Sequence, residues 1–391
     1  MASIELTSAG RGYRRSSDLQ RDFDAAAAVL RTIHAPANKS RTDSGVPINV
    51  VLEGGGVKGI ALVGALLVLE EAGFSVERIA GTSAGAVVGS ITAALRQSGS
   101  DLVPLVGYLR SLEFHKFMPE GRLHELLDHT GGRLAGLVAD AAHLTNREGL
   151  YSGEYLESWL RPIFTGLGIS TFADLRIEPD LPASAARASR LLVFVSDITR
   201  GRLTRLPAEY PLYGLDADEQ DPVRAVHASM AIPFFFEPVH VTAEEATMHV
   251  EIPGSGTTAV HFAGGRHTWV DGALLAKYPI HSFDPSSPEY SPHPTVGIKL
   301  SRFQTEYAPE GSHRSALAIA VHCLKTLVSE WDALTSHVAV AHRTIFVDGA
   351  VVGATDFDLS EHQEDELFLA GVGAATQYVI DVAASGGIPA A

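Results

Sequence analysis

Ser83 stands between two glycines in the sequence Gly81-Thr82-Ser83-Ala84-Gly85. Residues 76–80 before it have the apolar pattern of a short strand, and residues 84–95 after it that of a helix of small side chains. A sharp strand-to-helix turn projects a serine hydroxyl out of a fold, and its glycines permit strained backbone angles. Free N–H groups at the helix start also favour a negative oxygen. The pattern favours Ser83 as a nucleophile, although a serine that only caps a helix has the same sequence.

A glycine-rich segment lies upstream of this serine. It reads Gly54-Gly55-Gly56-Val57-Lys58-Gly59 and connects a predicted strand, residues 48–52, to a predicted helix, residues 60–72. Its backbone N–H groups suit an oxyanion hole or the pyrophosphate of a dinucleotide, and a turn that serves only packing is the third interpretation. No acidic residue stands at the end of the second strand, where a ribose partner belongs. Gly59 also follows Lys58 where a P-loop has Ser or Thr, so the oxyanion hole is favoured.

An aspartate follows a further predicted strand, residues 266–270, in the sequence Asp271-Gly272-Ala273. At the end of a strand its carboxylate can turn into a cleft at the same sheet edge as the serine. A partly desolvated carboxylate within hydrogen-bond reach of a serine hydroxyl can act as its general base. Because Asp-Gly is also an ordinary turn dipeptide, this motif gains weight only beside the other two.

The order of the elements indicates one large α/β domain. Strand, turn and helix occur twice within residues 48–95, the pattern of parallel strands joined by helices. Residues 1–46 are expected to form an N-terminal extension with a helix at 22–33, and residues 47–391 a single domain. The other expected elements are a mostly helical stretch at 101–175, strands at 190–198, 202–206, 296–300 and 344–347, a hairpin at 239–262, and helices at 222–231, 315–337 and 362–384.

The composition narrows the function classes. The chain has 391 residues, 46% of them hydrophobic, one cysteine (Cys323) and a formal net charge of −16. An acidic chain gains no general attraction to nucleic acid or anionic membranes, so no nucleic-acid partner is expected and membrane contact needs local patches. No secretory signal and no run of about eighteen apolar residues is present. We therefore expect a cytoplasmic protein, with membrane contact that is at most peripheral; export without a signal peptide would leave no trace here.

The three motifs together resemble those of the patatin-like phospholipase family, in the order G-G-G-x-K-G, G-T-S-A-G and D-G-A. Four further stretches are similar to that family: residues 149–153 (GLYSG), 171–175 (TFADL), 196–199 (SDIT) and 228–234 (ASMAIPF). The resemblance covers about residues 47–300. One departure is Lys277, which stands where many members have Asn in the loop after the aspartate.

This resemblance implies a three-layer α/β/α fold with a central, mostly parallel sheet and a helical insert. It implies hydrolysis of phospholipids or other lipid esters by a Ser83–Asp271 dyad without a catalytic histidine. Ser83 attacks the ester carbonyl and Asp271 accepts its proton. The segment at residues 54–59 supplies the oxyanion hole, chiefly through the amides of Gly55 and Gly56 together with Ala84. No metal or cofactor is implied, and no protein partner is indicated.

Other interpretations stay open on the sequence. An α/β-hydrolase-type esterase would use a Ser-Asp-His triad, and a catalytically silent lipid-binding module would keep only the fold. The histidines that follow Asp271, as the triad order requires, are His281, His293, His313, His322, His337, His342 and His362. The run at residues 232–236 (IPFFF) predicts a buried strand rather than an acyl pocket. The acidic stretch 356–366 predicts a solvated helix start rather than a metal site.

Overall fold

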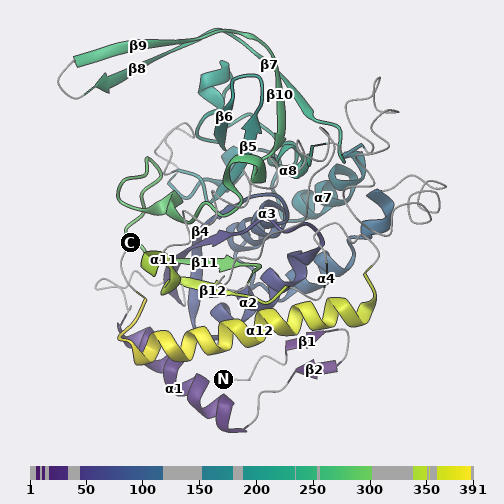
Figure 1. The fold of residues 1–391 in the computed structure, drawn as a ribbon, viewed down its shortest axis with the longest axis vertical. Helices are drawn as coiled ribbons and strands as arrows, with labels where there is room; N and C mark the ends of the chain where they lie inside the picture. The colour runs from purple at the N-terminus through teal and green to yellow at the C-terminus, as the bar shows by residue number, and fades with distance from the viewer. Residues whose placement is uncertain are drawn as a thin grey trace, which may run out of the picture.

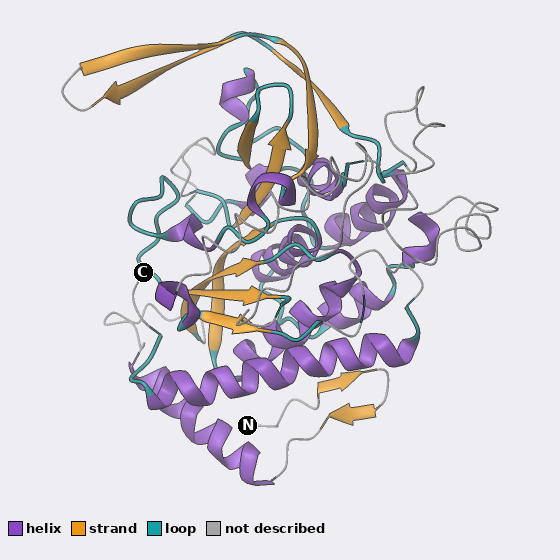
Figure 2. Ribbon diagram, viewed as in Figure 1, coloured by secondary structure: helices purple, strands orange, loops and turns teal. Residues whose placement is uncertain are grey.

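The computed structural model describes residues 6–8, 11–13, 17–33, 45–117, 152–178, 188–233, 235–252, 256–301, 338–349, 352 and 359–388. Within these residues, helices lie on both faces of an eight-stranded sheet (Figures 1 and 2). This is the three-layer α/β/α fold that the resemblance implied. The predicted helix at 315–337 and residues 118–151 of the predicted helical stretch lie outside the described residues.

The sheet is built from eight strands: β3 (Val46–Leu52), β4 (Phe74–Gly81), β5 (Leu191–Asp197), β6 (Arg202–Leu206), β7 (Val239–Ala243), β10 (Gly265–Asp271), β11 (Thr295–Lys299) and β12 (Thr344–Phe346). Their order is β12-β11-β3-β4-β5-β10-β7, with β6 paired to β5. The pairs from β12 to β5 are parallel. The pairs β5–β6, β5–β10 and β10–β7 are antiparallel. The predicted parallel arrangement of β3 and β4 is therefore confirmed.

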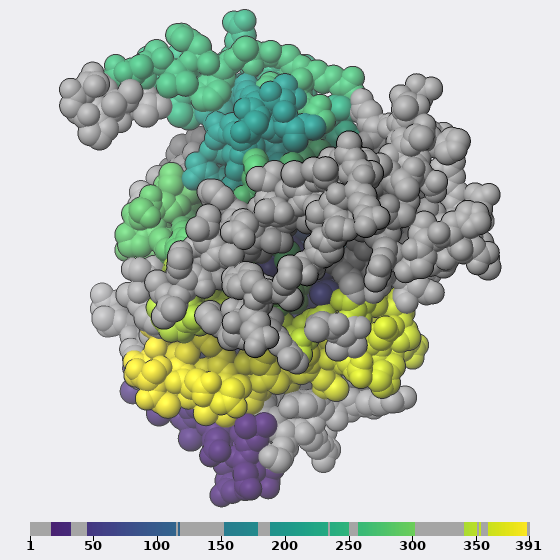
Figure 3. Space-filling view, in the orientation of Figure 1, coloured from purple at the N-terminus to yellow at the C-terminus, as the bar shows by residue number. Residues whose placement is uncertain are grey.

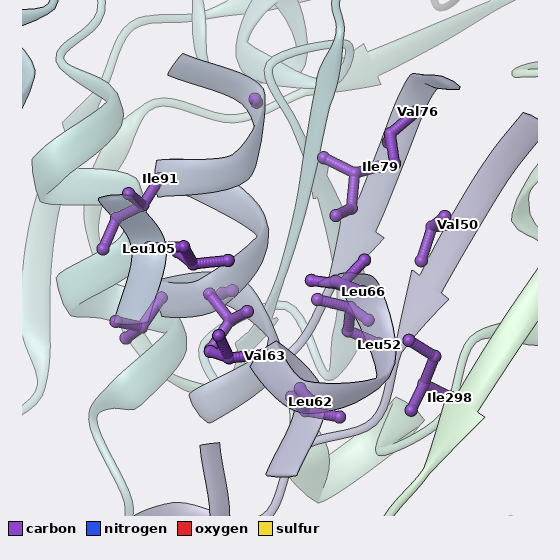
Figure 4. Packing of buried hydrophobic residues seen from close by; sticks show 14 of the residues in the cluster. Val50, Leu52, Leu62, Val63, Leu66, Val76, Ile79, Ile91, Leu105 and Ile298 are labelled. Carbon is purple, nitrogen blue, oxygen red and sulfur yellow. The ribbon is translucent and has the colours of Figure 1, made fainter. Parts of the chain in front are cut away.

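One face of the sheet carries the main hydrophobic core. Alternate residues of β3 divide between the two faces, since Val50 and Leu52 join the main core whereas Val51 joins a smaller cluster on the other face. Figure 4 shows part of the main core, in which Leu52 of β3 lies close to Leu66 of the next helix in the chain. The helices of this side include α2 (Gly59–Glu71), α3 (Ala84–Gln97), α4 (Pro104–Arg110), α7 (Glu154–Gly166), α8 (Pro222–Met230) and α12 (Glu361–Ala384).

The smaller cluster is covered by three short elements. They are α9 (Ala273–Ala276), the 3-10 helix η6 (Ile280–Phe283) and α11 (Val338–Ala341). Phe283 of η6 and Val340 of α11 are buried there beside Phe194 of β5. The chain that follows Asp271 thus runs directly over the second face of the sheet.

The C-terminal helix α12 packs tightly on α2. A Cβ at Gly64 would lie 2.3 Å from the carbonyl oxygen of Phe368, and one at Gly371 would lie 2.0 Å from that of Ala61. Among the described helices, α12 is long and apolar enough to cross a membrane by length and composition, and half of that apolar window is buried inside the protein. Its contacts with α2 are those of a core helix.

The N-terminal segment contributes α1 (Ser17–Ile33), a longer helix than the predicted 22–33. It packs on α12 (Figure 1). Nε of Arg31 donates to the carbonyl of Ala72 over 2.7 Å. Phe23, Ala27 and Leu30 of α1 are buried in the main core. The helix therefore shares the core of the chain that follows, and a domain boundary at residue 46 stays a prediction.

Two antiparallel ribbons lie outside the sheet. They are β1 (Leu6–Ser8) with β2 (Arg11–Tyr13), and β8 (Ala246–Ile252) with β9 (Gly256–Phe262). The hairpin predicted at 239–262 is therefore shorter than expected, because its first residues form β7 and pair with β10. The β8–β9 hairpin projects from the body of the molecule (Figures 1 and 3).

The described residues of the run 232–236 do not form the strand predicted there, although two of them are buried as expected. The amides of Phe235 and Phe236 donate to the carbonyl of Ile232 over 3.1 and 2.9 Å, which makes a turn. Both of these phenylalanines are buried. Pro233 has no N–H to donate to a ladder, so a turn is the physically easier conformation.

Candidate active site

Ser83 occupies a strained turn between β4 and α3. Its backbone angles are φ 54° and ψ −125°, and among the described residues it is the one non-glycine residue with a positive φ. A Cβ at Gly81 would lie 2.2 Å from the carbonyl oxygen of Gly85, and one at Gly85 would lie 2.5 Å from that of Leu52. Both glycines are therefore sterically required. Strain of this kind persists only where the surrounding structure enforces it, and it is typical of functional sites.

Side-chain hydrogen bonds from three elements hold this turn. The Ser83 amide donates to Oγ of Ser229 on α8 over 3.0 Å, and that hydroxyl donates to the carbonyl of Phe194 on β5 over 2.6 Å. Oγ1 of Thr82 donates to the carbonyl of Ala276, in the segment that follows β10, over 3.0 Å. The turn is thus tied to β5 through Ser229 and to the segment after β10 through Thr82.

Asp271 ends β10 and lies buried beside Ser83. Strands β4 and β10 flank β5 in the sheet, so strand pairing brings the two residues together. Oδ1 of Asp271 accepts a hydrogen bond from the amide of Ala273 over 2.8 Å. Burial raises the pKa of Asp271 to about 7, against the opposing effects of that amide and of a hydrogen bond with the Ser83 side chain. A carboxyl group that titrates near neutrality is suited to general base catalysis at neutral pH.

The glycine segment lies against the serine turn. A Cβ at Gly54 would lie 3.1 Å from Cβ of Ser83, so the missing side chain allows the close approach. Gly56 begins a short 3-10 helix with φ 59°, a left-handed conformation that favours glycine. The Gly54 amide is already used, because it donates to the carbonyl of Lys277 over 3.0 Å. Within the described part of the chain, no hydrogen bond uses the amides of Gly55, Gly56 or Ala84.

The other residues singled out in these motifs have packing roles in the structure. A Cβ at Gly59 would lie 3.5 Å from the Val88 side chain of α3. The Lys58 side chain lies beside Gly349, where a Cβ would be 3.1 Å from Cδ of the lysine. A Cβ at Gly272 would lie 2.2 Å from the carbonyl oxygen of Phe194, so this glycine lets β10 turn against β5.

Three residues near this site were not assigned from the sequence. Ser229 holds the Ser83 amide, and Oγ of Ser83 donates to Sδ of Met230 over 3.7 Å. Both fall in the stretch 228–234, which was noted only for its resemblance. Glu53 is fully buried at the end of β3, directly before the glycine segment, and pairs with Lys277 at 3.0 Å. A carboxylate beside an apolar strand is a signal that could have been found, since a buried charge needs a partner.

Two of the described histidines that follow Asp271 pair with carboxylates outside the dyad. His281 pairs with Asp284 at 2.6 Å, and His362 lies 3.7 Å from Glu366 on the exposed first turns of α12. His313, His322 and His337 lie outside the described residues. Within the described ranges no group of three or more His, Cys, Asp or Glu side chains could hold a metal ion.

The fold and the arrangement of the three motifs are those of a three-layer α/β/α lipid hydrolase. The family model for patatin-like phospholipase matches residues 50–284, a span that contains the glycine segment, Ser83 and Asp271. The uncharacterised protein YqhO of Bacillus subtilis is 32% identical over 319 residues, which cover 81% of this chain and 92% of YqhO. The chain belongs to the patatin-like phospholipase family. Its general class of activity is therefore the hydrolysis of lipid acyl esters.

More distant similarities extend this comparison. Lysophospholipase nte1 of Neurospora crassa is 41% identical over 134 residues, which are 34% of this chain and 7% of that much longer protein. VipD of Legionella pneumophila has a TM-score of 0.42 at 14% identity, covering 90% of this chain and 72% of VipD. Human GIVD cytosolic phospholipase A2 has a TM-score of 0.41 at 11% identity, covering 95% of this chain and 65% of the human chain.

Proposed function

We propose that the chain hydrolyses the acyl esters of phospholipids or lysophospholipids with Ser83 as nucleophile and Asp271 as general base. One observation carries the proposal. The Ser83 side chain, on a strained turn, interacts with the buried carboxyl group of Asp271, whose pKa is raised to about 7 by that burial. A carboxyl group in this state exists partly as a base at neutral pH and can take the serine proton directly.

The first half of the reaction forms an acyl-enzyme. Oγ of Ser83 attacks the ester carbonyl carbon while its proton passes to Asp271. The carbonyl oxygen becomes negative and accepts hydrogen bonds from backbone amides, for which Gly55, Gly56 and Ala84 are the proposed donors. The C–O bond to the leaving alcohol then breaks, and the proton held by Asp271 passes to the departing alkoxide oxygen.

The second half releases the fatty acid. A water molecule gives a proton to Asp271 and its oxygen attacks the acyl carbon, with the same amides binding the oxyanion. The bond to Oγ of Ser83 breaks, and the proton returns from Asp271 to the serine. The dyad is thereby restored without a histidine, and no metal or cofactor takes part in these steps.

Lipid specificity and location are the less direct parts of the proposal. Family membership and the similarity to a fungal lysophospholipase support a glycerophospholipid or lysophospholipid substrate. Met230, at the hydroxyl of Ser83, gives the reacting centre an apolar neighbour that is compatible with an acyl chain. We propose that the enzyme works in the cytoplasm and reaches its substrate by peripheral contact with a membrane.

One assay tests this proposal. Purified protein is incubated with phospholipids, lysophospholipids, galactolipids and short-chain nitrophenyl esters, and the products are identified by mass. Ser83→Ala and Asp271→Asn are run beside the wild type, and each should lose several orders of magnitude in kcat while the circular dichroism spectrum is kept. Release of fatty acid from phospholipid or lysophospholipid supports the proposal. If either variant keeps more than about a tenth of the wild-type kcat, the assignment of the dyad is contradicted.

A further inference from the structure

The carboxylate of Glu53 is fully buried between the end of β3 and the glycine segment. Its Oε1 lies 3.0 Å from Nζ of Lys277 and 3.5 Å from Nζ of Lys299. Its Oε2 accepts a hydrogen bond from the amide of Leu300. Burial raises the pKa of Glu53, but the two lysines and these hydrogen bonds outweigh that effect, so the net pKa is lowered. The side chain is therefore an ionised group held by partners on two other segments.

The first of these segments, at Ala276 and Lys277, touches both parts of the active site. The carbonyl of Lys277 accepts the hydrogen bond of the Gly54 amide over 3.0 Å. The preceding carbonyl, of Ala276, accepts that of the Thr82 hydroxyl over 3.0 Å. Lys277 thus holds the glycine segment at Gly54 through its backbone, and the preceding residue, Glu53, through its ammonium group.

The second segment supports the other side of the glycines. The Glu53 amide donates to the carbonyl of Ile298 over 3.1 Å, which extends the pairing of β3 with β11. Cδ1 of Leu300 lies only 2.4 Å from where a Cβ of Gly55 would be, so this side chain lies directly against Gly55. By binding the Leu300 amide, Glu53 fixes the residue that limits where Gly55 can lie.

From these contacts we propose that the Glu53–Lys277 ion pair is a positioning device for the oxyanion-binding amides of Gly55 and Gly56. The proposal rests on the function proposed above. A buried ion pair contributes little net stability compared with an apolar pair, because both charges lose their hydration. Its fixed geometry, however, sets the distance between the start of the glycine segment and the loop that follows Asp271. Lys277, which departs from the family pattern, therefore has a specific partner in this chain.

Lys277→Met tests the pair, since it keeps an unbranched side chain, one atom shorter, and removes its charge. We expect kcat on a soluble nitrophenyl ester to fall by about tenfold or more and KM to change less than about threefold, because an oxyanion interaction forms mainly in the transition state. Lys277→Arg, which keeps the charge, should restore most of the lost kcat. Arg176→Met is the matched control: it removes a half-buried ion pair with Asp218, 3.0 Å long, outside this network. It should lower the melting temperature without lowering kcat.

A double variant shows whether the pair acts through the glycines. If Lys277 works by placing the Gly55 amide, the two changes act on the same interaction. The loss of kcat in the double variant Lys277→Met/Gly55→Ala should then be much smaller than the product of the two separate losses. Full multiplication of the losses, or a kcat for Lys277→Met equal to wild type, would overturn the proposal. If Lys277→Met does not fold, Glu53→Gln, which keeps an acceptor for the Leu300 amide, must show the same fall in kcat. Wild type that neither cleaves esters nor reacts with an organophosphonate at Ser83 would instead refute the proposed function.

Discussion

The backbone amide of Ser83 donates its hydrogen bond to the side chain of Ser229, 3.0 Å away on α8. The same hydroxyl donates to the carbonyl of Phe194 over 2.6 Å, so one side chain links the serine turn to β5. Ser83 has a positive φ, which a residue with a Cβ adopts only under constraint. Ser229 supplies part of that constraint, although it takes no part in the proposed chemistry.

Ser229→Ala should therefore reduce activity and stability together. It leaves the Ser83 amide and the Phe194 carbonyl buried without this partner, which costs about 1–3 kcal/mol for an unsatisfied group. We expect a lower melting temperature and at least about a tenfold lower kcat. Ser90→Ala is the control, because Ser90 is also fully buried but its hydroxyl bonds only the Val87 carbonyl of its own helix. Wild-type kcat in Ser229→Ala would show that the turn needs no such support.

Activity should rise with pH through the neutral range. Asp271 accepts the serine proton only when it is ionised, and burial raises its pKa to about 7. We expect log(kcat/KM) on a soluble ester to increase by one for each pH unit below that value and to level off above it. A rate that stays constant between pH 5 and 8, in a protein that remains folded, would contradict this assignment of the base.

Asp271→Asn should stabilise the protein at alkaline pH. Since the pKa of Asp271 rises from 3.8 to about 7 on folding, the folded state binds this proton more tightly than the unfolded chain does. Its contribution to stability is complete below about pH 4 and is lost as the pH rises to about 7. The variant escapes that loss, which is of the order of a few kcal/mol. Its melting temperature should exceed that of wild type at pH 8, and the excess should shrink towards pH 4.5; an excess independent of pH would contradict the argument.

Local sequence patterns were sufficient to predict the elements that carry the motifs. The strand predicted at 48–52 is β3, and the helix predicted at 84–95 is α3, because apolar periodicity and glycine punctuation are properties of the segment itself. The strand β7 was assigned to a hairpin instead, because its partner β10 is not its neighbour in sequence. Local pattern cannot supply a pairing of that kind.

The supporting contacts of the site could not be predicted for the same reason. Lys277 was recognised as a departure from the family pattern, but its partner Glu53 lies 224 residues away in the chain. The hydrogen bond from Ser83 to Ser229 spans 146 residues. Such pairs are set by the order of strands in the sheet, which the motifs alone do not determine. The raised pKa of Asp271 likewise depends on burial by several segments.

The histidines that follow Asp271 should not behave as catalytic bases. Two of the four described ones are His281, which is half-exposed and pairs with Asp284, and His362, which is exposed on the first turn of α12. Single substitutions to glutamine at each of the seven positions should leave kcat within about tenfold of wild type, far above the loss caused by removing a member of a triad. A folded histidine variant as inactive as Ser83→Ala would replace the dyad by a triad.

Gly55→Ala should damage the transition state more than substrate binding. An added Cβ would lie 2.4 Å from Cδ1 of Leu300, so the glycine segment or that side chain must move. Because Leu300 is held through its amide by Glu53, we expect the glycine segment to be the part that moves. Its amides would then no longer point at the negative oxygen. Loss of one oxyanion donor costs about 3–4 kcal/mol, which predicts that kcat falls by about a hundredfold or more, with a much smaller change in KM.

The Gly55 prediction also separates an oxyanion hole from a nucleotide site. Gly107→Ala is the matched control, since Gly107 is exposed and a Cβ there would meet no atom within 4 Å. That variant should keep wild-type kcat. In Gly55→Ala an organophosphonate should still label Ser83, but more slowly, because the nucleophile and base remain while the donor that stabilises the developing negative oxygen is misplaced. A nucleotide site would predict instead that NAD or ATP binds the wild type. Micromolar binding of either in calorimetry, weakened by Gly55→Ala while esterase activity is unaltered, would overturn the oxyanion assignment.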